Sequence, residues 1–339
     1  MRVFVTGGTG FVGSHTVAEL VRRGHDVRLL VRDPDRIAPA LGPLGIADLD
    51  YAVGDVTDAS SVEKGLSGCE AVVHAASIYS FDTRDSKLMG EVNVDGTETV
   101  LAAAAKHGVG PVVYVSSLGV FYSPGGAVLD ERSPITDPRG AYYRSKADAE
   151  RIARAHQARG APIAITYPGG VFGPDDPHFG ENARIVASVL KRQLPAAPRG
   201  GLSIVDVRDL AQAHATLLEA EGDARRYVLS GRHLPFSSFI AALAQETGRR
   251  IPHLSLPAWS LRPAVRATSF LQRFSPLRLP FNIEGFDSVT WDPHGDDSRA
   301  GTDLGFEARP TRETLVDTVE WLYRTGRVSA AQAGKVATA

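Results

Sequence analysis

This chain of 339 residues has a single cysteine, nearly equal numbers of positive and negative side chains, and no long apolar run. Its only cysteine is Cys69, so no disulfide can form within the chain, which fits a reducing cytoplasm. The formal net charge of −2 gives no general attraction to nucleic acid or to an acidic membrane surface. No apolar run approaches the roughly 20 residues of a membrane-spanning helix, and glycines interrupt any signal-peptide core. These absences predict a cytoplasmic protein with no membrane span and no nucleic-acid partner.

The first half of the chain alternates short apolar runs with helix-forming stretches. The apolar, β-rich runs lie at residues 2–6, 27–31, 51–53, 71–74, 112–116 and 163–167. The helical stretches lie at 14–23, 60–66, 88–106 and 142–158. Because several runs are uniformly apolar, they indicate strands buried on both faces, as in a parallel sheet covered by helices. The pattern predicts an α/β fold.

The second half has a different texture, with Gly and Pro concentrated at 168–180 and 195–201. Further helices are expected at 181–192, 207–220 and 311–323. Residues 258–281 mix large apolar side chains with arginine and proline. Either a membrane-surface segment or a wall or flap of a substrate cavity fits them, and the prolines favour the wall or flap over a long continuous helix. The Ala/Gly/Ser-rich residues 327–339 are expected to form a flexible tail.

A glycine-rich turn follows the first predicted strand directly, and a helix-forming stretch follows the turn. It contains Gly7, Gly10 and Gly13, with Phe11 and Val12 between the last two. Glycines let the backbone turn tightly and approach a pyrophosphate, which then lies on the free N–H groups of the helix N-terminus. The turn predicts a dinucleotide site, because the strand before it and the helix after it are both present.

The end of the second strand bears on the choice of cofactor. An acidic residue there would hold the ribose 2′-OH of NAD, whereas an arginine accommodates the 2′-phosphate of NADP. Arg32 takes this place, with Asp33 one step further along and Arg36 as a second positive charge. The sequence thus favours NADP over NAD, with Arg32 as a plain surface charge as the alternative. Asp55, after the third strand, is either an acceptor for the adenine amino group or an ordinary turn aspartate.

Tyr142 and Lys146 lie four residues apart in a stretch without Pro or Gly, so a helix places both on one face. A nearby ammonium stabilises a phenolate, so the pair predicts a tyrosine of lowered pKa that acts in proton transfer. Tyr143 is the rival tyrosine, but the residue one turn beyond it is Ala147, which carries no charge.

Together these motifs resemble the extended short-chain dehydrogenase/reductase family (the NAD-dependent epimerase/dehydratase superfamily). The matching segments, in order, are Gly7-x-x-Gly10-x-x-Gly13, Asp55-Val56, Ala75-Ala76, Asn93 in Asn-Val-Asp-Gly-Thr, Ser116-Ser117, Tyr142-x-x-x-Lys146, 168–174 and 205–209. The run 27–34 looks most like the dihydroflavonol-4-reductase-like branch. The resemblance implies a Rossmann-type doubly wound parallel sheet with a smaller C-terminal substrate-binding lobe. Residues 1–167 would form the NADP-binding domain, 203–230 would return to it, and 168–202 with 231–326 would form the lobe.

The resemblance also implies roles for individual residues. Tyr142 would be the general acid/base, Lys146 would lower its pKa and bind the nicotinamide ribose, and Ser117 would donate a hydrogen bond to the substrate oxygen. Ser117 fits the family pattern better than Ser116, and strand alternation implies that the two cannot both serve. Asn93 would support the lysine, often through water. The remaining implied cofactor contacts are Val56, Ala75, Ala76, Pro168, Gly170 and Val171, together with Tyr142 itself.

Two departures concern the substrate. Tyr167 stands where many relatives have an arginine, and the basic stretch at 198–202 is short, with Arg199 alone. A nucleoside diphosphate carries two phosphates that need neutralising, so both features argue against a sugar-nucleotide substrate. No spaced His/Cys/Asp cluster indicates a metal, and His74 fits a core or loop position.

The combined prediction is an NADP(H)-dependent oxidoreductase that interconverts a carbonyl and a secondary alcohol on a small to mid-sized, fairly apolar molecule. One alternative is a nucleotide-sugar epimerase or dehydratase with tightly bound NAD. A second is a non-catalytic NADP-sensing regulatory protein. The resemblance allows a homodimer through the helices at 88–106 and 142–158, with a monomer as the alternative.

Overall fold

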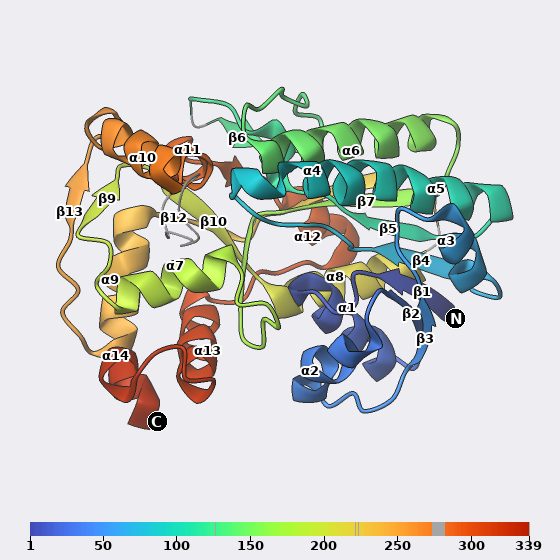
Figure 1. Ribbon diagram of the computed structural model, residues 1–339, viewed down its shortest axis with the longest axis horizontal. Helices are drawn as coiled ribbons and strands as arrows, with labels where there is room; N and C mark the ends of the chain where they lie inside the picture. The colour runs from blue at the N-terminus through green and yellow to red at the C-terminus, as the bar shows by residue number, and fades with distance from the viewer. Residues whose placement is uncertain (126, 221, 223, 273–281, 339) are drawn as a thin grey trace.

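The computed structural model of the protein describes residues 1–125, 127–220, 222, 224–272 and 282–338. Its larger part is a seven-stranded parallel sheet of order β11-β7-β5-β4-β1-β2-β3 (Figure 1). The strands are β1 (Arg2–Thr6), β2 (Asp26–Val31), β3 (Asp50–Val53), β4 (Ala71–His74), β5 (Val112–Val115), β7 (Ile163–Pro168) and β11 (Arg225–Leu229). The chain runs outward in opposite directions from β1 and β4, so the sheet is doubly wound, with its switch point between these two strands. The predicted α/β class is confirmed.

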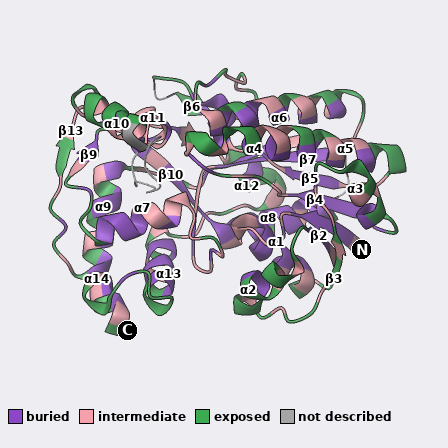
Figure 2. Cartoon of the chain, in the orientation of Figure 1, coloured by how far each residue is buried: buried purple, intermediate pink, exposed green. Residues whose placement is uncertain are grey.

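Helices cover both faces of this sheet, which explains why its central strands are apolar throughout (Figure 2). One face carries α3 (Ala59–Leu66), α4 (Ser86–Met89), α5 (Gly96–His107) and α6 (Ala141–Ala158). The other face carries α1 (Phe11–Arg22), α2 (Ile37–Leu41), α8 (Val207–Glu219) and α12 (Ser298–Leu304). Successive residues of β1 point to opposite faces, so Phe4 joins the core under α3 and α5 while Val5 joins the core under α1 and α8.

The single helix predicted at 88–106 is wrong in one respect, because a π-helical segment divides it. Residues Gly90–Asp95 form this segment between α4 and α5. π-Helical turns are uncommon and often lie at functional sites. Asn93, which was singled out in the sequence, lies within it.

The rest of the chain forms a smaller lobe, which we call the C-terminal lobe, at the left of Figure 1. Its strands are β8 (Gly170–Phe172), β9 (Ala196–Pro198), β10 (Gly201–Asp206), β12 (Arg232–Pro235) and β13 (Leu254–Leu256). Its helices are α7 (Glu181–Leu190), α9 (Phe236–Thr247), α10 (Ala258–Gln272), α11 (Ile283–Thr290), α13 (Thr311–Arg324) and α14 (Ala330–Ala333). Phe172, Phe239 and Leu322 lie in its separate core. A short pair of β6 (Val128–Leu129) and β14 (His294–Gly295) completes the strands.

The return to the large sheet, predicted at 203–230, begins a few residues later in the structure. Residues 203–206 still belong to β10, which pairs with β8 and β12 in the C-terminal lobe. From Val207 the chain forms α8 on the large sheet and then β11 at its edge.

Residues 258–272 depart from expectation, because α10 runs continuously through Pro263. A proline inside a helix removes one backbone hydrogen bond and clashes with the preceding turn. Pro263 lies in the second turn of α10, so the helix beyond it keeps its bonding pattern. The rest of the segment assigned to a wall or flap, residues 273–281, lies outside the described residues.

The flexible tail predicted from 327 is also wrong over the part that the structure describes. Ser329 and Gln332 form a reciprocal capping box that begins α14, and residues 334–338 continue as a 3₁₀ helix. Ala333 and Val336 are buried in the core of the C-terminal lobe, and Arg249 donates to the Gln332 carbonyl at 2.8 Å. Small residues, read as a sign of fraying, here permit close packing.

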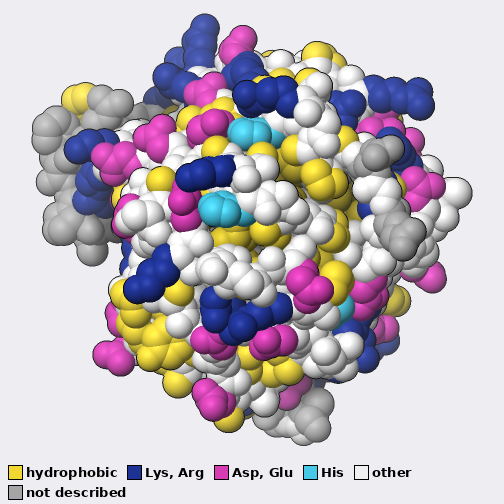
Figure 3. Space-filling model, turned by 90° about the vertical axis from the view of Figure 1, so that its right-hand side faces the viewer, with side chains coloured by type: hydrophobic (Ala, Val, Ile, Leu, Met, Phe, Trp, Pro, Cys, Tyr) yellow, Lys and Arg dark blue, Asp and Glu magenta, His cyan; other side chains and the backbone are white. Residues whose placement is uncertain are grey.

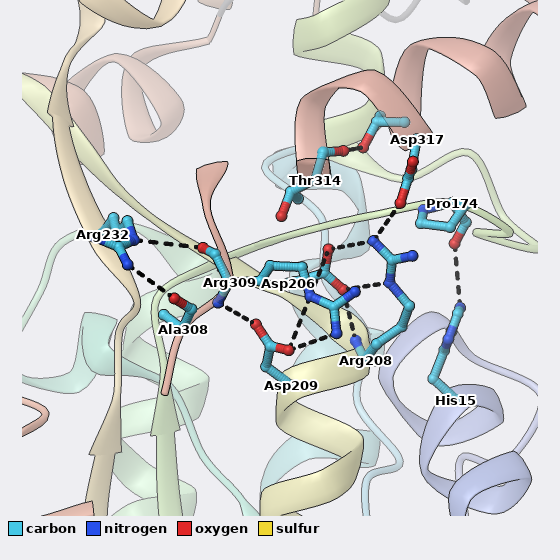
Figure 4. Close-up of polar contacts among 11 residues, drawn as sticks. His15, Pro174, Asp206, Arg208, Asp209, Arg232, Ala308, Arg309, Thr314 and Asp317 are labelled. Carbon is cyan, nitrogen blue, oxygen red and sulfur yellow. Dashed lines mark hydrogen bonds and ion pairs between the residues drawn. The ribbon is translucent and has the colours of Figure 1, made fainter. Parts of the chain in front are cut away.

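An ionic network connects the start of α8 to the C-terminal lobe (Figure 4). Arg208 donates to both carboxylate oxygens of Asp206, at 2.9 and 2.8 Å, and forms an ion pair with Asp317 of α13 at 2.6 Å. Arg309, before α13, pairs with Asp209 at 2.6 Å. Asp206 is fully buried, so the arginines compensate a charge that would otherwise be costly.

The surface shows no concentration of one charge on the face drawn in Figure 3, where basic and acidic side chains are interspersed. Among the described residues, none of the helices is both long and apolar enough to cross a membrane.

Candidate active site

A cavity of about 260 Å³ opens at the carboxyl ends of β1, β4, β5 and β7, where they face the C-terminal lobe. Ligands of doubly wound sheets bind at this edge, beside the switch point. The predicted site residues that line the cavity are Gly10, Phe11, Val12, Gly13, Ala75, Ser117, Tyr142, Lys146, Pro168, Gly170 and Val171. Those outside its lining are Gly7, Arg32, Asp55, Val56, Ala76 and Asn93. The cavity therefore brings both ends of the predicted site together.

The turn from β1 to α1 has room only for glycine at two positions. Gly7 has a φ of 75°, and a Cβ there would lie 2.5 Å from the Ala75 carbonyl carbon. A Cβ on Gly13 would lie 2.1 Å from the Gly7 oxygen. The turn consequently packs its bare backbone against the end of β4 and keeps side chains out of this edge of the cavity.

The first turn of α1 is suited to an anion. Gly10, its N-cap residue, offers no side-chain cap, and no acidic residue lies in the first turn. The amides there are therefore free of a carboxylate competitor and lie at the positive end of the helix dipole. These residues fit the pyrophosphate of a dinucleotide.

Arg32 follows β2 and extends into solvent. Its Nη1 lies 3.9 Å from Asp55 Oδ2, and the two side chains are 59% and 35% exposed. An exposed pair at this separation holds a guanidinium weakly, so Arg32 is available to another anion. Arg36, expected to add positive charge, instead pairs with Asp33 at 3.5 Å. Asp55 Oδ1 accepts from the amide and hydroxyl of Thr57, as a turn aspartate does.

Tyr142 and Lys146 both lie on the buried face of α6, as their spacing predicts. The Lys146 ammonium donates to the Val115 carbonyl at 2.9 Å and lies 5.2 Å from the centre of the Tyr114 ring. Burial lowers the pKa of Lys146 to about 8, against the opposing effect of the Glu150 carboxylate.

The predicted lowering of the Tyr142 pKa is wrong. Burial raises the pKa of this phenol, the Ser117 hydroxyl acts in the opposite direction, and the Glu284 carboxylate adds to the rise. The spacing of Tyr142 and Lys146 predicted an effect of charge, whereas the loss of hydration is the larger effect at a buried phenol. Tyr142 is therefore a neutral phenol that can donate a proton.

The two neighbouring serines both line the cavity. Strand β5 ends at Val115, so the alternation that would separate their side chains does not extend to them. Ser117 Oγ accepts from the Gly119 amide at 3.1 Å, and its hydroxyl acts to lower the pKa of the Tyr142 phenol. Ser116 Oγ is buried and has no hydrogen-bond partner among the described residues. The choice of Ser117 stays a prediction, and its electrostatic effect on Tyr142 supports it.

Asn93 hydrogen-bonds to two segments beside the cavity. Its Oδ1 accepts from the Ile78 amide at 2.7 Å, and its Nδ2 donates to Ser145 Oγ at 2.9 Å. Ser145 precedes Lys146 on α6, so Asn93 connects the segment after β4 to α6. Its predicted support of the lysine stays a prediction.

An aromatic wall beside Tyr142 was not identified in the sequence. The Tyr79 ring lies 4.7 Å from the Tyr142 ring, and the Tyr122 and Trp291 rings lie 5.3 and 6.5 Å from Tyr143. These aromatic residues come from separate parts of the chain and share no motif, so only the fold shows their proximity. Tyr79 and Tyr122 line the cavity, and Trp291 packs behind them against Tyr143.

A second group missed in the sequence is His233, Asp292 and His294 at the edge of the C-terminal lobe. Their ligand atoms lie within 4.8 Å of one another. The two imidazoles are stacked, however, with centroids 3.5 Å apart and an interplanar angle of 22°. Nearly parallel rings do not direct two nitrogen lone pairs at one ion, and His233 Nε2 is already bonded to Asp292 at 2.8 Å. This group is better explained as a polar contact within the lobe.

Comparison with known proteins identifies the family. Residues 3–230 match the model of the NAD dependent epimerase/dehydratase family. A putative dihydroflavonol 4-reductase of Synechocystis is 33% identical over 338 residues, covering 96% of this chain and 95% of that protein. Cinnamoyl-CoA reductase 1 of rice (Oryza sativa subsp. japonica) is 35% identical over 299 residues, covering 82% and 86%. The crystal structure of gox2253 superposes with a TM-score of 0.82 at 28% identity and covers 97% and 99%. The chain therefore belongs to the NAD-dependent epimerase/dehydratase family and is an NAD(P)-dependent oxidoreductase of the extended short-chain dehydrogenase/reductase type.

Proposed function

We propose that the protein reduces a carbonyl to a secondary alcohol, reversibly and with NADP(H), on a mid-sized apolar substrate that carries an aromatic ring. The observation that carries the proposal is the single cavity in which Tyr142, Ser117 and Lys146 face an aromatic wall. Aromatic rings favour stacking with a flat substrate. The names of the two curated relatives, a dihydroflavonol reductase and a cinnamoyl-CoA reductase, point to the same substrate class.

The chemistry assigned to the chain is proton delivery at the substrate oxygen. The nicotinamide, when bound, supplies the hydride. Negative charge then develops on the substrate oxygen, where the Tyr142 phenol donates its proton and Ser117 donates a hydrogen bond. Lys146, which donates to the Val115 carbonyl and lines the same cavity, would supply the positive charge that favours the phenolate as it forms. The amides of α1 and the turn that contains Gly7 would hold the pyrophosphate.

A direct test is the oxidation of NADPH by the purified protein with a dihydroflavonol, a simple aryl ketone and an aliphatic ketone as substrates. Turnover with one of the two aromatic ketones supports the proposal. Turnover restricted to the aliphatic ketone would contradict it.

Arg32 is the residue proposed to select NADP over NAD. A charged hydrogen bond contributes about 1.5–3 kcal/mol, so Arg32→Ala should raise the Kd for NADPH about tenfold or more. The Kd for NADH should stay within about twofold, since NADH has no 2′-phosphate. Quenching of protein fluorescence on titration with each cofactor measures both values.

The matched control is Arg36→Ala, because Arg36 is a nearby arginine that already pairs with Asp33. It should leave both affinities unchanged. Equal weakening of NADPH and NADH by Arg32→Ala would remove Arg32 from cofactor selection.

A nucleotide-sugar epimerase or dehydratase with tightly bound NAD remains the second candidate, supported by the name of the matching family. The pairing of three arginines disfavours it, because a nucleoside diphosphate carries two phosphates that need neutralising. Arg208 and Arg309 are committed to carboxylates, and the Arg154 guanidinium is paired with Glu150 at 2.7 Å. Absorbance near the nicotinamide band that persists in purified protein after dialysis would favour this candidate over the reductase. A third, a non-catalytic NADP sensor, would bind NADPH without turnover on any carbonyl.

A further inference from the structure

One carboxylate of the C-terminal lobe reaches the catalytic helix. Glu284 lies in the first turn of α11, at 8% exposure, and its Oε1 accepts from the Tyr143 amide at 3.0 Å. The amides of Ala141 and Tyr142 are also oriented to lower the pKa of this carboxyl group, against the larger effect of burial. The residue is 141 positions away from Tyr143 in the sequence.

The contact occupies the place of a helix cap. α6 begins at Ala141 after the N-cap residue Gly140, which supplies no side-chain hydrogen bond, and its first turn contains no acidic residue. An N-cap side chain ordinarily accepts from the second or third amide of the helix, and the Tyr143 amide is the third. Glu284, although distant in sequence, thus makes the hydrogen bond that a Ser or Asp at the N-cap position makes in other helices.

Gly140 and Glu284 are sterically matched. A Cβ on Gly140 would lie 2.2 Å from both Cδ and Oε1 of Glu284. Gly140 has an ordinary φ of −70°, so its backbone does not require glycine. The missing side chain instead leaves the space that the carboxyl group fills.

Contacts of its neighbours on α11 fix the position of Glu284. Asn282 caps α11 by accepting from the Gly285 amide at 2.8 Å, and the Ile283 amide donates to Ser269 of α10 at 2.9 Å. Asp287, one turn further along α11, pairs with Arg262 of α10 at 2.5 Å. These contacts connect both α10 and α11 to the carboxylate that caps α6.

We propose that Glu284 is a positioning residue for Tyr142: it caps the catalytic helix from the C-terminal lobe and thereby couples the placement of the proton donor to the lobe that binds substrate. This role rests on the proposed function of Tyr142. Tyr142 lies in the first turn of α6, the part of a helix that frays when its amides lack acceptors. Burial raises the pKa of Glu284 to about 7, so the carboxyl group acts as a hydrogen-bond acceptor in a dry site more than as a fixed charge.

The test compares Glu284→Gln with Glu284→Asp. Gln keeps the length and the acceptor oxygen without the charge, whereas Asp keeps the charge and loses the reach. A positioning role through the hydrogen bond predicts kcat within about twofold of wild type for Gln and about tenfold lower for Asp and Ala, since misplacement by about 1 Å can cost up to 10²-fold. The KM for NADPH should stay unchanged in all three. The reaction used is NADPH oxidation with whichever of the dihydroflavonol and the aryl ketone the wild type reduces faster.

Hydrogen exchange supplies a readout that does not need turnover. Amides of residues 141–144 should exchange faster in Glu284→Asp and Glu284→Ala than in wild type and keep wild-type protection in Glu284→Gln. Glu246→Gln is the matched control, because it neutralises another buried carboxylate of the C-terminal lobe, one that pairs with Arg312 of α13 at 3.0 Å. It should leave both kcat and the exchange of α6 unchanged.

Three results would overturn the inference: wild-type kcat in Glu284→Asp, a loss in Glu284→Gln equal to that in Glu284→Asp, or the same loss in Glu246→Gln. Failure of the proposed function is distinguishable, because it would appear as full activity in Tyr142→Phe. Failure of the Glu284 role alone would appear as an inactive Tyr142→Phe beside fully active Glu284 variants. If Glu284→Ala does not fold, Gln and Asp still decide the matter.

Discussion

The Tyr142→Phe variant is expected to reduce its carbonyl substrate about 10³-fold more slowly than the wild type, because a positioned general acid contributes about 10²–10⁴-fold to such a step. The ring of Phe keeps the packing against Tyr79, so the cavity should keep its shape. Only the proton donor to the developing oxyanion is lost. The measurement is kcat from NADPH oxidation at saturating cofactor, together with the Kd for NADPH, which should change by less than about twofold since the phenol is remote from the pyrophosphate turn.

Tyr143→Phe is the matched control for this prediction. Tyr143 is adjacent in sequence, buried and aromatic, but it packs against Tyr122 and Trp291 and has Ala147 one turn beyond it. Its loss of one hydroxyl should leave kcat within a fewfold of wild type. Comparable losses in both variants would show that the cavity responds to any missing hydroxyl, and the assignment of Tyr142 as acid would be withdrawn.

The Gly13→Ala variant should lose NADPH binding by about 100-fold or more, with a stability loss of about 1–3 kcal/mol from overpacking. The added methyl group would lie 2.1 Å from the Gly7 oxygen, and backbone cannot move aside as a flexible side chain can. The turn must open to admit it, and the amides of α1 then lose their arrangement around the pyrophosphate. Fluorescence titration with NADPH and thermal unfolding without cofactor measure the two effects separately.

Gly42→Ala provides the comparison, since Gly42 has helical φ and nothing within 4 Å of the added Cβ. It should bind NADPH normally and be equally or slightly more stable, because alanine reduces the entropy of the unfolded chain. Normal NADPH affinity in Gly13→Ala would mean that the cofactor does not lie on this turn.

Local pattern was enough to predict six of the seven strands of the large sheet and most of its helices, but not the edge strand β11. Strands β1, β4 and β7 are buried on both faces, so their apolar runs leave little ambiguity, and the helix at 142–158 begins within one residue of α6. Features that depend on one extra residue or on distant packing were missed. The π-helical segment Gly90–Asp95 has the same composition as an ordinary helix, and the buried C-terminus looked polar and small in isolation.

The same contrast between local pattern and distant packing applies to the residues of the site. The glycine turn and the Tyr142–Lys146 pair were predicted from short spacings, and the structure places residues of both at one cavity. Tyr79 lines the same cavity, and Trp291 and Glu284 contact Tyr143 next to it, from single positions that form no sequence motif, so only tertiary structure shows them there. The Tyr142 pKa illustrates the limit in energetic terms, because spacing shows a neighbouring charge but not the hydration that burial removes.

The path of the chain between its two parts limits how such a protein can be recombined. After β7 the chain leaves the large sheet for β8 and β10, and only then returns as α8 and β11. A chimera joined once at residue 167 would exchange α8 along with the lobe, and with it the apolar cover that Leu210, Leu217 and Leu218 provide for the core beneath α1. Transplanting a substrate lobe onto this nucleotide-binding sheet therefore requires junctions on both sides of α8–β11, so new specificities are reached more readily by substitution within the cavity than by exchange of segments.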